Sequence, residues 1–336
     1  MRSFGRLFAM TGWRYAVSTD LPGFTAFLGK AERHCVALAE HSLRPSFLAA
    51  PVVETRTAAG LRTAVEPCTA VEPCTAGAKG LLFLHESEDR DTDGAMLVRG
   101  QGSIYLLLPD SGASDDGLPA LLDGVDGGAR RIHQISGKAG DVERFECASA
   151  GERLETREYL LMFRPAGTPS GMAVPFDTSV PSGTSLALPP TPQGFLIRKA
   201  ERRDFRALSR LQEEYEAEEV YGSLHTDPSG AAIRVRRLLG WQEIVIALCG
   251  GKPAGKANTN ARGLRCDQLG GIFVRPEFRN AGLGTAMVGA LVAGLSAQGR
   301  DIALYVRSGN KSAIAVYEKA GFAVIDGYRS DEWRHA

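Results

Sequence analysis

The stretch GGIFVRPEFRNAGLGTAM at residues 270–287 decides the fold of the C-terminal half. An apolar run leads into the turn RNAGLG at 279–284, and a helix is predicted over 283–298. Gly282 and Gly284 have no Cβ atom, so this turn can adopt a positive φ and approach an anion closely. The unpaired N–H groups of the helix start point at the same turn. These features together predict a seat for a pyrophosphate group.

A plainer interpretation of the turn is open, because a G-x-G pair also suits a simple tight turn. The turn lacks the Lys-Ser/Thr pair of a P-loop and the third glycine of a dinucleotide fingerprint. Its context favours the anion seat, since Met287, Leu291 and Leu295 form an apolar stripe that lets the helix pack and hold the turn still. After the next strand, Asn310 is expected to cap a helix over 311–320.

Strands and helices follow one another throughout the C-terminal half. The expected strands are 195–198, 244–248, 254–260, 268–274, 302–306 and 322–325, and the expected helices are 202–219, 229–240, 283–298 and 311–320. In the second helix, Ile233 and Val235 are among the residues available for burial. This order predicts an α/β fold, with helices flanking a sheet of mixed pairing.

The N-terminal half also predicts a mixed α/β domain. The expected elements are helices at 22–43 and 118–122, strands at 81–84, 95–99, 103–108, 132–135 and 159–163, and a hairpin at Gly100–Gly102. A proline-rich, nearly uncharged segment at 165–193 cannot form a regular element. We therefore expect an N-terminal domain at 1–164, a linker at 165–193 and a C-terminal domain at 194–336.

The hexapeptide TAVEPC occurs twice in succession, at 63–68 and 69–74. A tandem duplication inside a tolerant surface loop is favoured over a metal or redox site, because neither copy has helical or strand periodicity. The chain has 6 cysteines, no C-x-x-C pair and no zinc-finger spacing. Reduced thiols in a cytoplasm and no metal site are therefore expected.

Composition limits the classes of function. The chain has 336 residues, enough for two domains at roughly 150 residues each. Its net charge of +0 argues against a nucleic-acid partner. No apolar run reaches the ~18–20 residues that cross a bilayer. The first residues lack a clean apolar core and a cleavage site, so neither secretion nor a membrane is expected.

The segments GGIFVRPEFRNAGLGTAM (270–287) and NKSAIAVYEKAGF (310–322) resemble the GCN5-related N-acetyltransferase family, or GNAT. The resemblance covers roughly 194–330. Residues 256–287 further resemble a bacterial subgroup with an extra N-terminal domain, whose front half is a diverged relative of the same fold. The resemblance implies acetyl-CoA as co-substrate and direct attack of an amine on its thioester.

The resemblance also implies roles for single residues. The implied binding residues are the backbone of Ile272, Phe273 and Val274 for the pantetheine arm, Arg279, Asn280, Ala281, Gly282, Leu283 and Gly284 for the pyrophosphate, and Asn310 near the pantetheine or thioester. Tyr317 matches the position whose hydroxyl often protonates the departing thiolate. An ordinary half-buried core tyrosine is the alternative at that position.

The general base cannot be identified from the sequence. No histidine lies in the predicted core strands, and Gln268 occupies a position where some family members carry a carboxylate. Asp267 is adjacent but is expected to face the other side of its strand. A water relay is a further possibility.

An acidic cluster ends the first helix of the C-terminal half. Its members are Glu213, Glu214, Glu216, Glu218 and Glu219, with Tyr215 and Tyr221 among them. A pocket for a cationic acceptor is one interpretation, and a solvated helix face is the favoured one. His225, just beyond, is expected to be an ordinary loop histidine.

The sequence therefore predicts an N-acetyltransferase that acts on a primary amine of a small molecule or a protein. An acyl-CoA-binding sensor without turnover is the alternative, and a nucleotide-phosphate binder is a third reading. The acceptor and the oligomeric state cannot be derived from the sequence.

Overall fold

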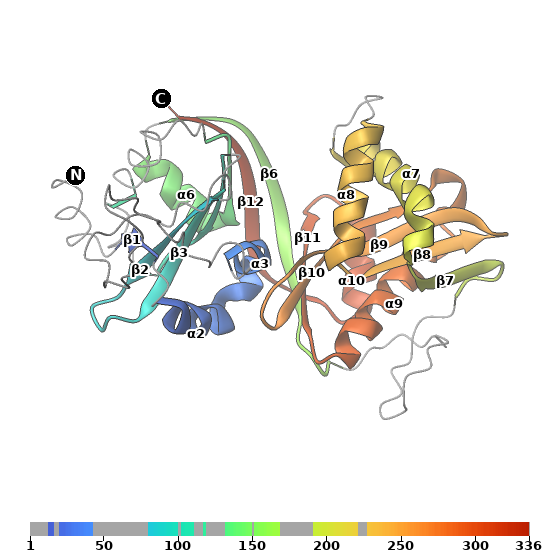
Figure 1. Cartoon of the computed structure of the whole chain (residues 1–336), viewed down its shortest axis with the longest axis horizontal. Coiled ribbons are helices and arrows are strands. Elements are labelled where there is room, and N and C mark those ends of the chain that lie inside the picture. Colours follow the sequence, from blue (N-terminus) through green and yellow to red (C-terminus); the bar gives the residue numbers. More distant parts are fainter. Residues whose placement is uncertain are drawn as a thin grey trace, which may run out of the picture. The chain divides into compact units, whose positions relative to one another are not determined.

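The computed structural model describes residues 13–16, 20–42, 80–99, 102–110, 117–118, 132–149, 151–168, 191–220 and 227–335. The chain divides into two compact units. Figure 1 shows the whole chain, coloured by position in the sequence. Unit 1 comprises Met1–Arg157 and Arg329–Ala336, and unit 2 comprises Glu158–Tyr328. The end of β6 (Gly151–Arg164), from the N-terminal half of the chain, thus belongs to unit 2, and the end of β12 (Ala323–His335), from the C-terminal half, belongs to unit 1.

Unit 2 contains all the C-terminal strands and helices that the sequence predicts. Its strands are β6 (Gly151–Arg164, from Glu158 onward), β7 (Phe195–Lys199), β8 (Ile244–Cys249), β9 (Lys252–Arg262), β10 (Cys266–Val274), β11 (Asp301–Arg307) and the start of β12 (Ala323–His335). From β6 the strand order is β6-β11-β10-β9-β8-β7, and of these neighbours only β10 and β11 are parallel. The predicted mixed sheet is confirmed, although β12 is much longer than the strand expected at 322–325.

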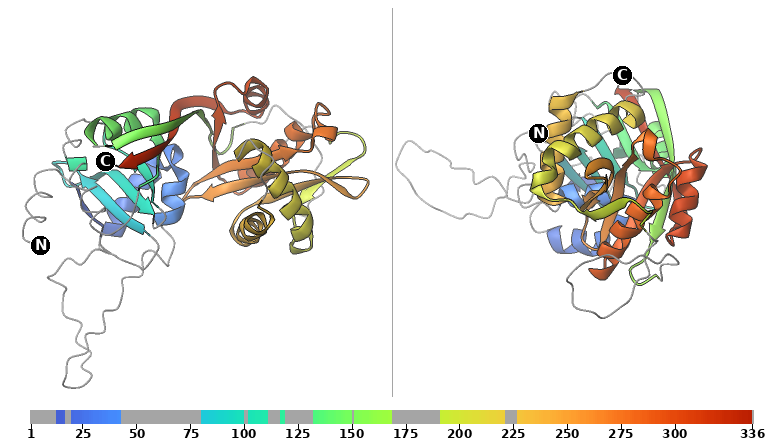
Figure 2. Two further views of the ribbon diagram at one scale, coloured as in Figure 1. Left: turned by 90° about the horizontal axis from the view of Figure 1, so that it is seen from above. Right: turned by 90° about the vertical axis from the view of Figure 1, so that its right-hand side faces the viewer.

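The helices of unit 2 cover both faces of its sheet (Figure 2). They are α7 (Phe205–Tyr215), which continues as a π-helical turn at Glu216–Val220, α8 (Pro228–Trp241), α9 (Leu283–Ala297) and α10 (Lys311–Lys319). Helices α7 and α8 pack on β8 and on Phe273 of β10, whereas α9 and α10 pack on the opposite face. In α8, Val235 is buried but Ile233 is 62% exposed, so the expected burial of Ile233 is wrong. Residues two apart lie about 200° apart around a helix and cannot share a face.

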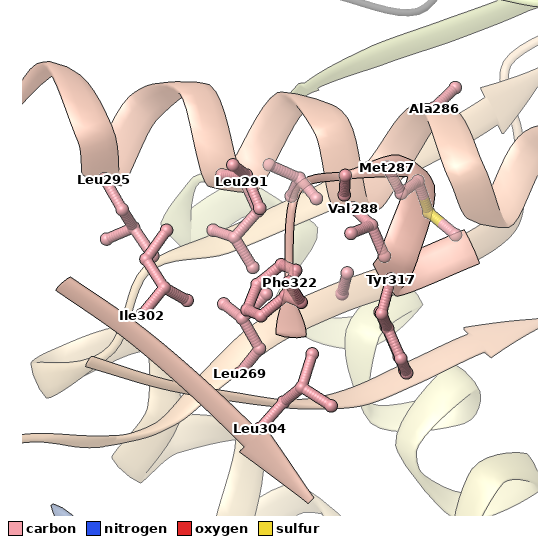
Figure 3. Packing of buried hydrophobic residues seen from close by; sticks show 14 of the residues in the cluster. Leu269, Ala286, Met287, Val288, Leu291, Leu295, Ile302, Leu304, Tyr317 and Phe322 are labelled. Atoms are coloured by element: carbon pink, nitrogen blue, oxygen red, sulfur yellow. The ribbon is translucent and has the colours of Figure 1, made fainter. Parts of the chain in front are cut away.

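The expected apolar stripe of α9 forms one side of the larger core. Met287, Leu291 and Leu295 are buried and belong to the same cluster as Leu304 and Tyr317 (Figure 3). Burial of a leucine or methionine side chain contributes about 1.5–3 kcal/mol. This packing fixes the start of α9, and with it the turn that precedes the helix.

Unit 1 is a second mixed α/β fold. Its strands are β1 (Trp13–Tyr15), β2 (Gly80–Glu86), β3 (Thr92–Arg99), β4 (Ser103–Leu107), β5 (Gln134–Lys138), the start of β6 and the end of β12, and its helices are α2 (Leu21–Ala31), α3 (Val36–Ser42) and α6 (Ala139–Ala148). The single helix expected over 22–43 is wrong, because a 3-10 turn and the non-helical φ of −152° at Cys35 separate α2 from α3.

The two units repeat one strand pattern. In unit 1, β2, β3 and β4 pair antiparallel in series, β4 then pairs parallel with β5, and α6 follows. In unit 2, β8, β9, β10, β11 and α10 repeat this order and these directions. The pattern supports the expectation that the front half is a diverged copy of the C-terminal fold.

Several expected features lie outside the described residues. These are the TAVEPC repeat, most of the helix at 118–122, the tip of the hairpin at Gly100–Gly102 and most of the linker at 165–193. The domain boundaries drawn around that linker stay predictions. Among the helices in the described ranges, none combines the length and the apolar character needed to cross a membrane.

Candidate functional site

Strands β10 and β11 separate part of the way along their length. Within the described residues their parallel ladder ends at Leu269 and Leu304, although β10 continues to Val274 and β11 to Arg307. Beyond that point β11 stays paired with β6 on its other side. The backbone of β10 after Leu269 therefore has an open edge toward β11. An extended ligand can add to such an edge as an extra strand.

The predicted pantetheine-binding residues lie on this open edge, called here the slot. Phe273 and Val274 remain paired with β9, and the ladder between β9 and β10 is irregular between Gly270 and Phe273. Ile272 and Val274 pack with the α9 core, whereas Phe273 packs with the α7 core. This alternation is that of a regular strand, and it leaves backbone groups, not side chains, toward the slot.

The turn RNAGLG follows the slot after a short 3-10 turn at Pro276–Phe278. Asn280 and Gly282 both have left-handed backbones, with φ of 62° and 75°. Gly282 is the N-cap of α9, and as a glycine it offers no side-chain acceptor to the first N–H groups of the helix. Among the residues that the structure describes, a Cβ on Gly282 would meet only Pro192, at 4.0 Å. Within the described ranges the helix start is thus unobstructed at Gly282, which offers its N–H groups no side-chain cap, as an anion seat requires.

Arg279 stands at the entrance to this turn. Its Nε donates to the carbonyl of Val274 at 2.9 Å, and its Nη2 donates to both carboxylate oxygens of Glu218 at 2.7 Å. The guanidinium also lies 5.8 Å from the centroid of the Phe273 ring. Arg279, which the sequence predicts to bind phosphate, therefore lies at the start of the turn, but Glu218 already pairs with its charge.

The acidic cluster is largely paired with arginines. Glu214 binds Arg275 at 2.7 and 2.8 Å, Glu216 pairs with Arg234, and Glu218 pairs with Arg279. Glu216 is only 4% exposed, so the cluster is not simply a solvated face. These pairs tie the end of α7 to α8 and to the residues that follow β10, and they leave less free negative charge for a cationic acceptor than the sequence suggested. Tyr221 and His225 lie outside the described residues.

Tyr317 lies in the buried part of α10. Its ring meets Phe322 edge to face with centroids 6.0 Å apart, and the side chain is 8% exposed. Burial raises its pKa, and the nearby Tyr215 and Glu219 raise it further. The hydroxyl is therefore fully protonated at neutral pH, and it acts as a hydrogen-bond donor more readily than as a proton source for a thiolate of pKa ~8.5.

Asn310 caps α10, as the sequence predicts. Its Oδ1 accepts from the backbone N–H of Ala313 at 3.1 Å and from the hydroxyl of Ser312 at 3.0 Å. The oxygen is thus committed to the helix. A contact with a bound pantetheine would fall to the Nδ2 group.

Asp267 and Gln268 lie in the part of β10 that still pairs with β11, just before the slot begins. Asp267 is fully buried and paired with Arg300 at 2.7 Å and with Arg262 at 3.3 Å, so it serves as a structural ion pair. The Oε1 of Gln268 is buried and has no hydrogen-bond partner among the described residues. An amide cannot act as a base at neutral pH, so neither residue fills the role that the sequence left open.

Lys256, on β9, is the residue that sequence reasoning missed. Its side chain is 1% exposed, and its Nζ donates to the carbonyl of Gly271 at 2.8 Å and to Oδ1 of Asn258 at 2.9 Å. Nζ lies 4.9 Å from the centroid of the Tyr215 ring. Burial lowers the pKa of Lys256 to about 7, although the negative charge of Glu216 acts in the opposite direction and raises the pKa. A signal existed, because Lys256, Asn258 and Asn260 alternate along an interior strand and so share a face.

Two glycines make room for these polar side chains. Gly271 has a φ of 57°, and a Cβ there would lie 2.3 Å from Oδ1 of Asn258 and 2.8 Å from Nζ of Lys256. A Cβ on Gly270 would lie 1.9 Å from Nδ2 of Asn260. The pair Gly270–Gly271 thus lets a buried amine reach the backbone where the slot opens.

Comparison with known proteins agrees with this fold. Residues 255–333 match the family model described as FR47-like protein. A GCN5-related N-acetyltransferase from Sphaerobacter thermophilus matches with a TM-score of 0.55 and 16% identity over 95% of this chain and 94% of its own. A tandem GNAT protein from the clavulanic acid biosynthesis pathway matches with a TM-score of 0.52 and 14% identity over 95% of this chain and 98% of its own.

A Drosophila protein also matches, with a TM-score of 0.60 and 11% identity over 96% of this chain and 98% of its own. No curated protein matches the sequence. The match to the tandem protein spans both units, in agreement with their repeated strand pattern. The predicted resemblance to the GNAT family and the predicted mixed α/β fold are confirmed.

Proposed function

We propose that this chain, which carries an FR47-like segment on a GNAT acetyltransferase fold, transfers an acetyl group from acetyl-CoA to a primary amine. One observation carries the proposal. The open edge of β10 after Leu269 is followed, after a short 3-10 turn at Pro276–Phe278, by the start of α9, where Gly282 provides no side-chain cap. A ligand with an extended, amide-bearing arm can pair with the strand edge, and its diphosphate can bind the N–H groups of the helix start. Acetyl-CoA is such a ligand.

In this proposal the cofactor is a co-substrate, and this chain binds and orients it. The backbone of Ile272, Phe273 and Val274 holds the pantetheine arm. Residues 279–284 hold the diphosphate. Acetyl-CoA supplies a thioester carbonyl that an amine can attack.

The remaining chemistry needs no covalent intermediate with the protein. A neutral amine attacks the carbonyl, and a backbone N–H at the open edge of β10 stabilises the developing oxyanion. Coenzyme A leaves as a thiolate, to which the Tyr317 hydroxyl donates a hydrogen bond. Most of the rate advantage comes from the alignment of the two substrates, which is worth about 7–11 kcal/mol in favourable cases.

We propose a primary amine on a small molecule or a protein as the acceptor. We also propose the cytoplasm as the compartment of the protein.

A second candidate is a sensor that binds acyl-CoA without turnover. It is favoured by Gln268, which stands where a catalytic carboxylate would help. The two functions differ in one measurement, the release of free thiol from acetyl-CoA in the presence of a panel of small and peptide amines. Titration calorimetry with CoA provides the companion measurement. Binding together with thiol release supports the transferase, binding with no release from any amine supports the sensor, and no binding contradicts both.

A further inference from the structure

A fully buried amine lies beside the slot, and the steps proposed above do not use it. Lys256 lies on β9 opposite Phe273, and its Nζ binds the carbonyl of Gly271 at 2.8 Å. Gly271 is two residues beyond the last pair of the β10–β11 ladder. The amine therefore lies next to the point at which an added ligand strand would begin.

The surroundings of Nζ suit a neutral amine. The two N–H groups of a neutral lysine match the two acceptors present, Asn258 Oδ1 and the Gly271 carbonyl. The lone pair is then left to accept a proton. Burial lowers the pKa of the amine to about 7, near the value at which a general base works best at neutral pH.

The charged and titratable groups around Lys256 come from three elements. From α7 and its π-helical extension come Tyr215, whose pKa is raised to about 12, and Glu216. From α8 comes Arg234, which pairs with Glu216, and Gln212 of α7 donates to the same carboxylate at 2.7 Å. Glu216 is thus in an ion pair with Arg234, and its negative charge still favours a protonated Lys256, which partly offsets the effect of burial.

Several other titratable groups near the slot are unsuitable as bases. Asp267, Glu214 and Glu218 are held in arginine pairs. Tyr215 and Tyr317 hold their protons at neutral pH, because burial raises both pKa values. The described residues of unit 2 include no histidine.

We propose that Lys256 is the group that accepts the proton of the acceptor ammonium. The inference rests on the proposed function. Nζ takes one proton from the ammonium, which yields a neutral acceptor amine and a Lys256 ammonium. The neutral amine forms the C–N bond, the C–S bond breaks, and the second proton of the amine ends on the coenzyme A sulfur. The Lys256 proton then returns to solvent, past Asn258 and the exposed Asn260, which are linked by a hydrogen bond of 3.0 Å.

The test compares three variants by thiol-release kinetics over pH and by calorimetry with CoA. In the wild type, turnover should rise through an acidic limb near pH 7. Lys256→Met should lose this limb and about 10²–10³-fold of kcat at neutral pH, with a CoA Kd within about threefold. Lys256→Arg should be equally slow, because a guanidinium of pKa above ~12 cannot accept the proton. The control is Lys252→Met, an exposed lysine on the same strand, which should match the wild type.

The results separate a base from a positioning residue. If the arginine variant recovers most of the turnover, or if the methionine variant keeps the limb near pH 7, Lys256 only holds the Gly271 carbonyl and the inference is wrong. Such a result leaves the transferase function standing. If the wild type binds CoA but releases no thiol with any amine, the proposed function fails first, and the role of Lys256 fails with it.

Discussion

The guanidinium of Arg279 holds both carboxylate oxygens of Glu218 at 2.7 Å, at the entrance to the turn proposed to bind a diphosphate. Both side chains are about two-fifths exposed, with values of 39% and 41%. An ion pair of this exposure contributes about 0–1 kcal/mol to stability. It still opposes ligand binding, because the guanidinium must be shared with, or released to, a diphosphate.

We therefore expect Glu218→Gln to tighten CoA binding. Removal of the competing carboxylate should lower the Kd by about two- to fivefold at low salt, which corresponds to the stated energy of the pair. The gain should shrink at high salt, because exposed charges are screened. Calorimetry with CoA at two salt concentrations measures both effects.

The matched control is Glu213→Gln, on the same helix, which removes the same charge at a position for which no arginine pair is described. An equal gain in both variants would point to a general change in surface charge. Weaker binding in Glu218→Gln would mean that the glutamate positions Arg279 for the ligand.

Gly282→Glu should abolish detectable CoA binding. The substitution puts a carboxylate and a bulky side chain in front of the α9 N–H groups, and a φ of 75° strains any residue with a Cβ. Gly282→Ala introduces the strain without the charge. It should cost about 1–2 kcal/mol of stability and keep measurable affinity. Calorimetry and thermal unfolding distinguish the two variants, and unchanged affinity in Gly282→Glu would move the diphosphate elsewhere.

Tyr317→Phe should lower kcat by about tenfold while the CoA Kd changes less than threefold. The ring would keep its edge-to-face packing on Phe322, so the core should stay intact. Only the hydroxyl, and with it a hydrogen bond to the thiolate, is removed. The loss should be modest, because a phenol whose pKa is raised by burial is a poor proton source. Unaltered kcat would reduce Tyr317 to a core residue.

Short sequence patterns correctly predicted the turn before α9 and the start of α10. They could not predict which distant segments of the chain pair as strands. The positive φ of Gly282 and the cap at Asn310 follow from residues within one turn of each position. The pairing of Tyr159 with Arg307 joins residues far apart in sequence, and no pattern near either residue specifies it. Helix α6 was missed because its sequence, AGDVERFECA, carries few apolar residues and buries mainly Val142 and Phe145.

The same distinction explains why Lys256 was overlooked. Its strand was predicted, and so was the helix that bears Tyr215. The burial of its amine, however, depends on how α7 lies over β9, and its hydrogen bond depends on the irregular ladder at Gly271. Neither follows from the residues of β9 alone.

The buried amine also predicts an unusual dependence of stability on pH. The pKa of Lys256 falls from about 10.4 in the unfolded chain to about 7 in the fold. Between these values the unfolded chain binds more protons than the folded protein, so this lysine makes stability rise with pH in that window. From pH 7 to 9 its contribution to the free energy of unfolding should increase by about 2 kcal/mol.

Urea unfolding of the wild type and of Lys256→Met at pH 7, 8 and 9 measures this contribution as the difference between the two proteins. The difference should change by about 2 kcal/mol in favour of the wild type as the pH rises, whatever the fixed cost of the lost hydrogen bonds. Lys252→Met, at the exposed start of the same strand, should leave the pH dependence of the wild type unchanged. A constant difference between wild type and Lys256→Met would mean that the buried lysine keeps its proton in the fold at these pH values. It would then remove the basis for Lys256 as a proton acceptor, independently of any assay of acetyl transfer.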